Sequence, residues 1–170
     1  MSVHKPLSTY DRSMQVAVCG PSQCTDEEAK AAFEVGRQLV RRGATVLCGG
    51  GSGVMAAVAA GVRSLDGLVV GVLPGPAADR TNLSIVIDTG MGEARNAVLV
   101  RSADAVIVIG GSPGTLSEVG LALRRGSIPV VSLYGWRVLD QHGRPVPGIQ
   151  EAADAGHAVA IALSPADNGG

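Results

Sequence analysis

Short apolar runs that alternate with helix-like segments are the feature that most constrains how this chain can fold. Strands are expected over seven of the runs, at residues 14–20, 44–50, 67–75, 84–90, 104–111, 128–135 and 157–163. Helices are expected at 26–43, 54–65, 93–102, 115–126 and 148–156. Strands that are apolar along their whole length have both faces covered, which is typical of a parallel sheet between two layers of helices. The pattern predicts a doubly wound α/β fold with a mostly parallel sheet of about seven strands.

The size of the chain indicates a single domain. Its 170 residues, 46% of them hydrophobic, are enough for one compact unit with a substantial core. The domain is expected to span residues 14–163, with polar tails at 1–13 and 164–170. The stretch "YGWRVLDQHGRPVPG" at 134–148 is polar and rich in glycine and proline, so it is predicted to be a loop.

Charge and aromatic content argue against several kinds of partner. The formal net charge is −1, from 14 basic and 15 acidic residues mixed along the chain, so no basic stripe for nucleic acid is present. The four aromatic residues are scattered and predict no stacking platform for single strands. The first residues lack the apolar core of a signal peptide, and no apolar run approaches the roughly 20 residues of a membrane span. We therefore expect a cytoplasmic protein without membrane or nucleic-acid partners.

The cysteines and lysines narrow the chemistry further. Cys19, Cys24 and Cys48 lack zinc-type spacing, so no metal is expected, and buried or half-buried thiols are the simplest interpretation. Whether Cys19 and Cys48, at the ends of the first two expected strands, line a pocket is left open. Lys5 and Lys30 are the only lysines, which leaves no lysine after a glycine loop for a kinase-type phosphate loop and none placed for a pyridoxal Schiff base. No cofactor is predicted.

Glycine clusters follow several of the expected strands. In an open parallel sheet, ligands bind outside the carboxyl ends of the strands, where backbone N–H groups and helix N-termini can approach an anion. The residues expected to bind the phosphate of a ligand of about mononucleotide size are Gly20, Ser22, Gly50, Gly51, Gly111, Ser112, Gly114 and Thr115. The alternative is that these glycines only allow tight turns between strand and helix.

Glu118 has two possible roles. Thr115 and Glu118 have the T-x-x-E spacing of a capping box, and Thr25 and Glu28 show the same spacing at the first expected helix. A capping role alone would therefore account for Glu118. Its position beside the richest glycine loop, at the edge where ligands bind, favours a functional role instead.

Arg95 is the expected partner of Glu118. On a helix, Arg95 lies on the same side as Met91, Val98 and Leu99, so its guanidinium emerges from an apolar face and needs an anion. Two structural alternatives remain: the side chain extends past the core to water, or it forms a simple ion pair with Glu118.

These residues carry a resemblance. "CGGGSGVMAAVAAG", "GVLPG", Arg95 and "GGSPGTLSE" resemble the LOG (Lonely Guy) family, once labelled lysine decarboxylase-like, over residues 14–135. The resemblance implies a Rossmann-like domain that forms a homodimer or higher homo-oligomer. It also implies a phosphoribohydrolase that cleaves the N-glycosidic bond of nucleoside 5′-monophosphates to free base and ribose 5-phosphate, with Arg95 and Glu118 as the catalytic pair.

The chain departs from the LOG motif at four positions, one of which is Glu93, where the motif has a histidine just before the arginine. Gly110 stands where the motif has proline, Ser112 where it has a second glycine, and Asn96 where it has a lysine after the arginine. The run at 89–123 looks closer to a sister branch, the proteins similar to molybdenum cofactor carriers, for which binding is the assigned role. The alternative to a hydrolase is therefore a carrier or sensor of a phosphate-bearing ligand, such as a pterin cofactor or AMP.

The hydrolytic hypothesis assigns a role to each group. The loop at 111–115 would hold the 5′-phosphate, and Glu118 would activate water or stabilise an oxocarbenium-like state. Arg95 would stabilise the negative charge that develops on the departing base, or would hold the carboxylate in place. A second carboxylate would strengthen this mechanism, and Asp88 is the only further candidate.

Overall fold

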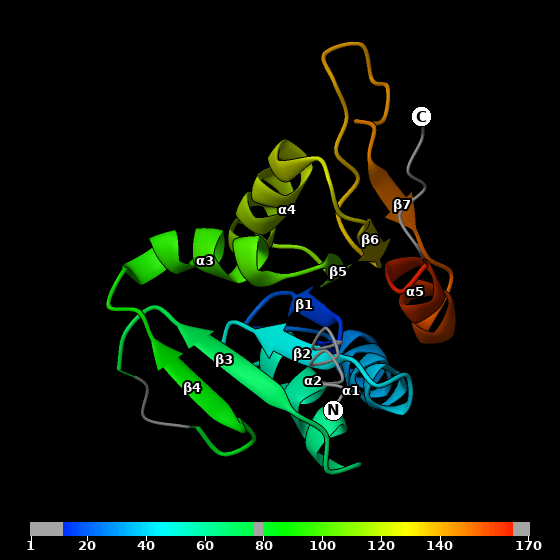
Figure 1. Cartoon of the computed structure of the whole chain (residues 1–170). Coiled ribbons are helices and arrows are strands. Elements are labelled where there is room, and N and C mark those ends of the chain that lie inside the picture. Colours follow the sequence, from blue (N-terminus) through cyan, green and yellow to red (C-terminus); the bar gives the residue numbers. More distant parts are fainter. Residues whose placement is uncertain (1–11, 77–79, 165–170) are drawn as a thin grey trace, which may run out of the picture.

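The computed structural model describes residues 12–76 and 80–164, and within them the strands form a single parallel sheet. The strands are β1 (Gln15–Cys19), β2 (Thr45–Cys48), β3 (Val69–Leu73), β4 (Ile85–Asp88), β5 (Ala105–Ile109), β6 (Val130–Leu133) and β7 (Ile149–Glu151). Their order is β4-β3-β2-β1-β5-β6-β7, and each neighbouring pair is parallel (Figure 1). The predicted doubly wound α/β fold is confirmed.

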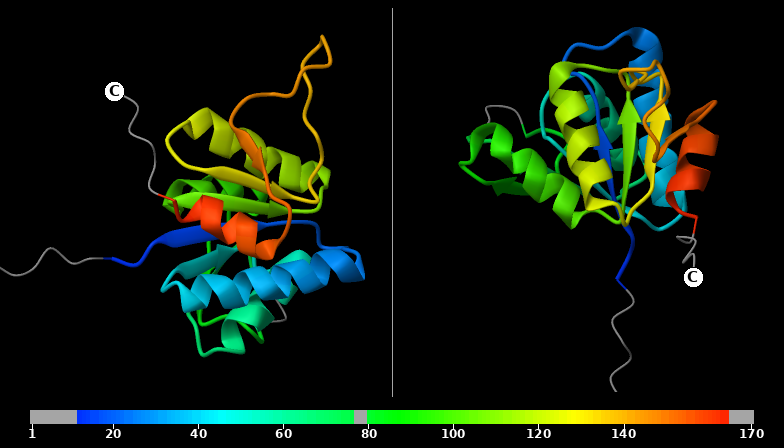
Figure 2. Two further views of the ribbon diagram at one scale, coloured as in Figure 1. Left: turned by 90° about the vertical axis from the view of Figure 1, so that its right-hand side faces the viewer. Right: turned by 90° about the horizontal axis from the view of Figure 1, so that it is seen from above.

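Helices cover both faces of the sheet. The helices are α1 (Asp26–Arg41), α2 (Val54–Arg63), α3 (Arg95–Ser102), α4 (Pro113–Arg125) and α5 (Ala155–Ala162), with a 3₁₀ turn η1 (Gly92–Ala94) before α3. Figures 1 and 2 show α1, α2 and α5 on one face and α3 and α4 on the other. Residues of β1 alternate between the two faces: Val16 and Val18 belong to the core under α1, α2 and α5, while Ala17 and Cys19 belong to the core under α3 and α4.

The last two elements correct the sequence prediction. A helix was expected at 148–156 and a strand at 157–163, but the structure has β7 first and α5 second. β7 pairs with β6 in the register Val130↔Ile149. Asp154 caps α5, because its side chain accepts a hydrogen bond from the amide of His157 at 2.8 Å. The run "HAVAIAL" is apolar on all sides, and such a short run does not distinguish a strand from a buried helix.

The sheet has a topological switch point between β1 and β5. From β1 the chain adds β2, β3 and β4 on one side, and from β5 it adds β6 and β7 on the other. The helices that follow these two strands leave in opposite directions, which opens a crevice at the carboxyl ends. Figure 2 shows the 134–148 segment leaving the sheet at this same end. The segment is irregular apart from one antiparallel bridge, Leu139↔Pro145, so the predicted loop is confirmed.

Within residues 12–76 and 80–164, no helix has the length and the apolar character needed to cross a membrane.

Candidate functional site

The loops after β1 and β5 meet at the switch point. Gly20 is buried directly after β1, and a Cβ added to it would lie 2.5 Å from the carbonyl oxygen of Ile109 and 2.5 Å from the side chain of Val54. Only glycine fits there. Gly20 therefore lets β5 and the start of α2 approach the end of β1, and it draws the surrounding loops together.

The N-terminus of α4 opens at this edge. Ser112 is its N-cap: the Ser112 hydroxyl accepts a hydrogen bond from the amide of Thr115 at 3.2 Å and lies 2.9 Å from the Thr115 hydroxyl. Pro113 occupies the first helical position, where a missing N–H costs nothing. Gly114 is exposed, and amides of the first turn have no carbonyl partner within the helix. The segment 111–115 thus has the geometry of an anion site, with Thr115 buried beneath it as a support.

The structure overturns the capping explanation of Glu118. Because Ser112 caps α4, Thr115 lies inside the first turn and Glu118 lies in the second. The same T-x-x-E spacing at Thr25 and Glu28 does form a capping box, as predicted. Glu118 instead points into the core beneath α4 and is only 6% exposed.

Burial controls the protonation of Glu118. It raises the pKa of the carboxyl group to about 7, while the positive charge of Arg95 and a hydrogen bond from Cys19 lower it in part. A carboxyl group with a pKa near 7 exchanges protons readily at neutral pH, which is the property of a general acid or base.

The cysteines are buried or half-buried thiols, as expected. Cys19 ends β1 beneath Glu118, and burial, followed by the negative charge of Glu118, raises the pKa of its thiol well above the usual value. Cys48 ends the neighbouring β2, and burial raises its pKa to about 11. Both groups therefore stay protonated at neutral pH, and the Cys19 S–H can donate to Glu118.

The side chain of Arg95 neither extends to water nor forms an ion pair with Glu118, the two structural alternatives that the sequence left open. Its Nη1 donates to the carbonyl oxygens of Gly49 and Val72, each at 2.5 Å, so the guanidinium spans the ends of β2 and β3. Its Nε is buried and has no hydrogen-bond partner within the described residues. The ion pairs among those residues do not include one with Glu118. Since carbonyl groups do not neutralise it, the charge of Arg95 remains available to an anion and acts on Glu118 from a distance.

The loop after β2 lies beside the loop after β1. The hydroxyl of Ser52 donates to the carbonyl oxygen of Ser22 at 2.9 Å, and the Ser22 side chain is exposed. Gly50 has a φ of +72°, and a Cβ there would overlap Leu73. Gly51 is exposed beside it.

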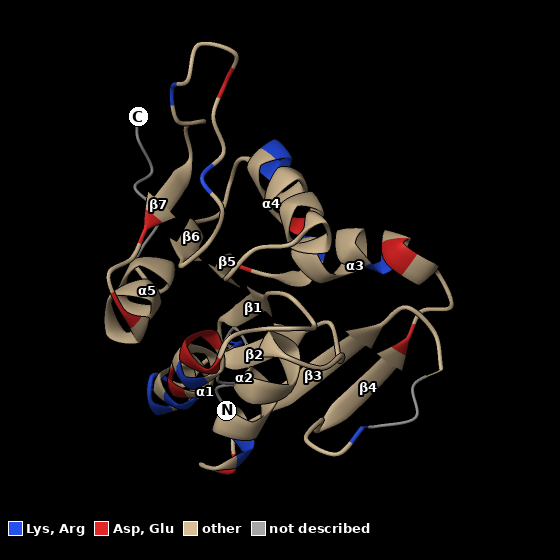
Figure 3. Cartoon of the chain, turned by 180° about the vertical axis from the view of Figure 1, so that it is seen from behind, with Lys and Arg blue, Asp and Glu red and all other residues tan. Residues whose placement is uncertain are grey.

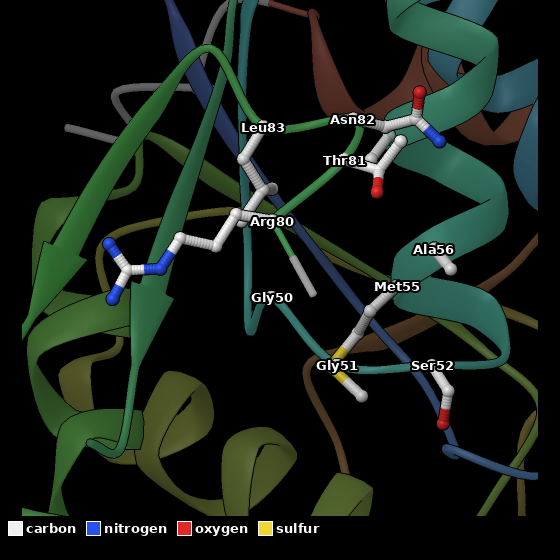
Figure 4. A pocket seen from close by; sticks show the side chains of 10 residues that line it. Gly50, Gly51, Ser52, Met55, Ala56, Arg80, Thr81, Asn82 and Leu83 are labelled. Carbon is white, nitrogen blue, oxygen red and sulfur yellow. The ribbon is translucent and has the colours of Figure 1, made fainter. Parts of the chain in front are cut away.

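Two hollows flank this loop. The one on the α2 side has a volume of about 310 Å³. Figure 4 shows Ser52 and Met55 at its α2 side and Thr81, Asn82 and Leu83 across from them. In the same view Arg80 extends away from α2. The second, of about 380 Å³, lies between residues 49–51, residues 73–76 and Arg95. The predicted residues Gly50 and Gly51 border both.

Asp88 does not join the site. It ends β4, the outer strand of the sheet, while Glu118 lies over β1, and its carboxylate accepts a hydrogen bond from the amide of Gly90 at 3.2 Å in a local turn. Glu118 therefore has no second carboxylate beside it from this strand, unlike the pair used by inverting glycosidases.

Two aromatic residues were missed by the sequence analysis. Tyr134 and Trp136 follow β6 at the same edge, and the Trp136 ring packs directly on Gly111. Their position could have indicated a role. The pair comes directly after β6, and because β6 lies next to β5, residues at its end lie beside the loop that follows β5.

Fold and site together define a Rossmann-like α/β protein whose ligand-binding edge is built from glycine loops. The chain belongs to the SLOG cluster4 family, whose sequence profile matches residues 13–164. This confirms the resemblance to the LOG-like proteins.

Individual relatives extend this assignment. An uncharacterized protein from Archaeoglobus fulgidus is 40% identical over 134 residues, 75% of this chain and 88% of the relative. A probable cytokinin riboside 5′-monophosphate phosphoribohydrolase from rice is 35% identical over 121 residues, 68% of this chain and 48% of the relative, so the chain spans about half the length of that protein. Among solved structures, the molybdenum cofactor binding protein from Rippkaea orientalis superposes with a TM-score of 0.79 at 31% identity, covering 89% of this chain and 96% of that chain.

Proposed function

We propose that this chain binds a small molecule that carries a phosphate, either a nucleoside 5′-monophosphate or a pterin phosphate, at the carboxyl edge of the sheet. The observation that carries the proposal is the N-terminus of α4, which is capped by Ser112 and opens at the switch point between β1 and β5. The phosphate would accept hydrogen bonds from the amides of Gly111, Ser112 and Gly114, aided by the helix dipole, because Pro113 has no N–H and the Thr115 amide donates to Ser112. Arg95, which bonds backbone carbonyls and is in none of the ion pairs among the described residues, supplies a positive charge at the same edge.

The relatives support this class of ligand. The name of the rice protein refers to a cytokinin riboside 5′-monophosphate, and the name of the Rippkaea protein refers to the molybdenum cofactor. One phosphate loop would serve both. Carriage or sensing of such a ligand requires only binding, and the similarity in length to the molybdenum cofactor protein favours it.

Hydrolysis of the N-glycosidic bond is a second candidate, favoured by the protonation state of Glu118. The ionised carboxylate would take a proton from water while the water oxygen bonds to the anomeric carbon of ribose. The bond from that carbon to the base nitrogen would break, and its electron pair would leave with the base. The base nitrogen then takes up the proton, so water and nucleotide give free base and ribose 5-phosphate. Arg95 would stabilise the negative charge that develops on the departing base.

One experiment separates the two candidates. Native protein and the Glu118→Gln variant are incubated with a panel of nucleoside 5′-monophosphates, free base is measured by chromatography, and binding is measured by equilibrium dialysis. Base release by the native protein that is lost in the variant supports hydrolysis. Binding by both proteins without base release supports a carrier or sensor. Failure of every phosphate ligand to bind contradicts the proposal as a whole.

A homodimer or higher homo-oligomer and a cytoplasmic location belong to the same proposal. Light scattering during size-exclusion chromatography measures the first directly, and a mass of 17.1 kDa in solution would contradict it.

A further inference from the structure

Two aromatic side chains are exposed beside the phosphate loop. Tyr134 is 48% exposed and Trp136 is 52% exposed, although aromatic side chains of this size are usually buried for the most part. Both follow β6, the strand next to β5. The exposed rings therefore lie at the edge where the proposed ligand binds.

Trp136 is in direct contact with the loop that follows β5. A Cβ added to Gly111 would overlap the indole ring, so the ring lies against the backbone of that residue. Trp136 also lines the same small hollow as Gly111, Ser112 and Thr115. The hollow has a volume of about 20 Å³, which admits roughly one water molecule and no ring. A ligand ring can therefore meet Trp136 only on the exposed outer part of the indole.

Neighbouring residues hold the aromatic segment in place. A Cβ on Gly135 would overlap the Ser132 hydroxyl and lie 3.5 Å from the carbonyl oxygen of Gly110, so the two loops pack together. Tyr134 has a φ of +59°, a conformation that is uncommon for a residue other than glycine. Backbone in such conformations persists where the surroundings enforce it, and these positions concentrate at ligand-binding sites.

We propose that Trp136 is the surface on which the planar ring of the phosphate-bearing ligand stacks, an inference that rests on the proposed function. A ligand held by its phosphate at 111–115 has the indole within reach, because Trp136 touches Gly111. Stacking tolerates different ring systems, since every base and pterin has a π-face. Leu116, exposed on the first turns of α4 and bordering the same hollow, extends the apolar surface.

The chain carries a built-in reporter for this contact, because Trp136 is its only tryptophan. The fluorescence of the native protein is titrated with AMP, with neopterin monophosphate and with ribose 5-phosphate, which carries the phosphate but no ring. We expect the emission to be quenched by the ligands with rings and to change little with ribose 5-phosphate. Comparison of AMP with the pterin identifies the ring system.

Variants separate stacking from support of the loop. Trp136→Ala should weaken binding of the preferred ring ligand about tenfold and binding of ribose 5-phosphate less than about twofold, both measured by calorimetry. Trp136→Phe, which keeps a ring, should recover most of the affinity. Leu139→Ala serves as the control, because Leu139 is equally exposed on the same segment and is not among the residues that border the hollow.

Each remaining outcome is decisive. If AMP or the pterin binds without changing the emission, and Trp136→Ala binds it as tightly as the native protein, the stacking role is wrong and the proposed function stands. Equal loss of AMP and ribose 5-phosphate binding would show that Trp136 only supports the loop. If dialysis detects no binding of any of the three probes, both proposals fail.

Discussion

At the residue scale, Glu118 is an ionisable side chain in a buried position, where water cannot stabilise its charged form. Its carboxyl group lies under α4 with Cys19 below and the charge of Arg95 nearby, and burial dominates its pKa. The sequence could not show this, because the T-x-x-E pattern is the same at Thr115 as at Thr25. Both threonines even have a serine three positions earlier, Ser22 and Ser112. Only Ser112 caps its helix, whereas Thr25 itself caps α1, and Glu118 therefore lies one turn further into α4.

The raised pKa of Glu118 makes folding stability depend on pH. The folded carboxyl group has a pKa of about 7 against an ordinary value of 4.5, so the folded protein binds more protons than the unfolded chain between these values. Its contribution is therefore fully present below pH 4.5 and is lost as the pH rises through 7. The difference amounts to roughly 3 kcal/mol.

Glu118→Gln removes this dependence, because the amide does not ionise. We expect the variant and the native protein to unfold at similar urea concentrations at pH 5, and the variant to be the more stable at pH 8. A difference in unfolding free energy that is constant from pH 5 to pH 8 would show that Glu118 titrates normally.

The thiol of Cys19 should affect the pKa of Glu118. Because its hydrogen bond lowers the pKa of Glu118, Cys19→Ala is expected to raise that pKa further above 7. Cys48→Ala is the matched control: Cys48 is equally buried at the end of the next strand, but Glu118 is not among the groups that shift its pKa. Carbon-13 NMR of labelled glutamate side chains measures the midpoint directly. Equal midpoints in both variants would rule out the contact.

At the element scale, hydrophobic patterning predicted most of the fold. The strands up to β6 and the first three helices fall within the predicted ranges, because apolar runs mark the strands and the helices have an amphipathic period. The helix predicted at 115–126 begins earlier, at Pro113, because Ser112 caps α4. The last pair was reversed, since an all-apolar segment such as 157–163 lacks that period. Asp154 could have indicated a helix there, because aspartate is a common N-cap residue and it stands just before the run.

Close packing of α1 against α2 depends on glycine at a helix crossing. A Cβ on Gly61 would overlap the backbone carbonyl of Phe33, which cannot move aside as a side chain can. Gly61→Ala should therefore destabilise the protein by about 1–3 kcal/mol. Gly120, in α4, faces open space, so Gly120→Ala should stabilise it by about 0.5–1 kcal/mol through helix propensity. Urea unfolding of both variants measures the two effects, and stabilisation by both substitutions would contradict the close helix contact.

At the scale of the whole molecule, one edge of the sheet gathers the candidate site. The sequence predicted this convergence, because parallel strands end at the same edge and glycine loops follow β1, β2 and β5. It could not predict that Arg95 spans the ends of β2 and β3, or that Trp136 lies on Gly111, since both are contacts between distant segments. Figure 3 shows acidic and basic residues mixed on α1, whereas the basic residues of α4 gather in its last turn, away from the loop that follows β5.

The opposite edge provides a natural comparison. A hollow of about 470 Å³ lies there, bordered by Arg12, Met14, Asp104, Ser127, Pro129, Leu163 and Ser164. Arg12 and Asp104 neutralise each other in an ion pair of 2.6 Å, so this larger hollow has less to offer a phosphate than the edge that carries Arg95.

The most direct test of the account is an NMR titration of the nitrogen-15-labelled protein with AMP and with neopterin monophosphate. We predict that the amide signals of Gly20, Gly111, Ser112 and Gly114 and the indole signal of Trp136 shift on binding, while that of Ser127 at the opposite edge does not. Shifts confined to the opposite edge, or none with either ligand, would contradict the central claim that this fold presents a phosphate-ligand site at the carboxyl ends of β1 and β5.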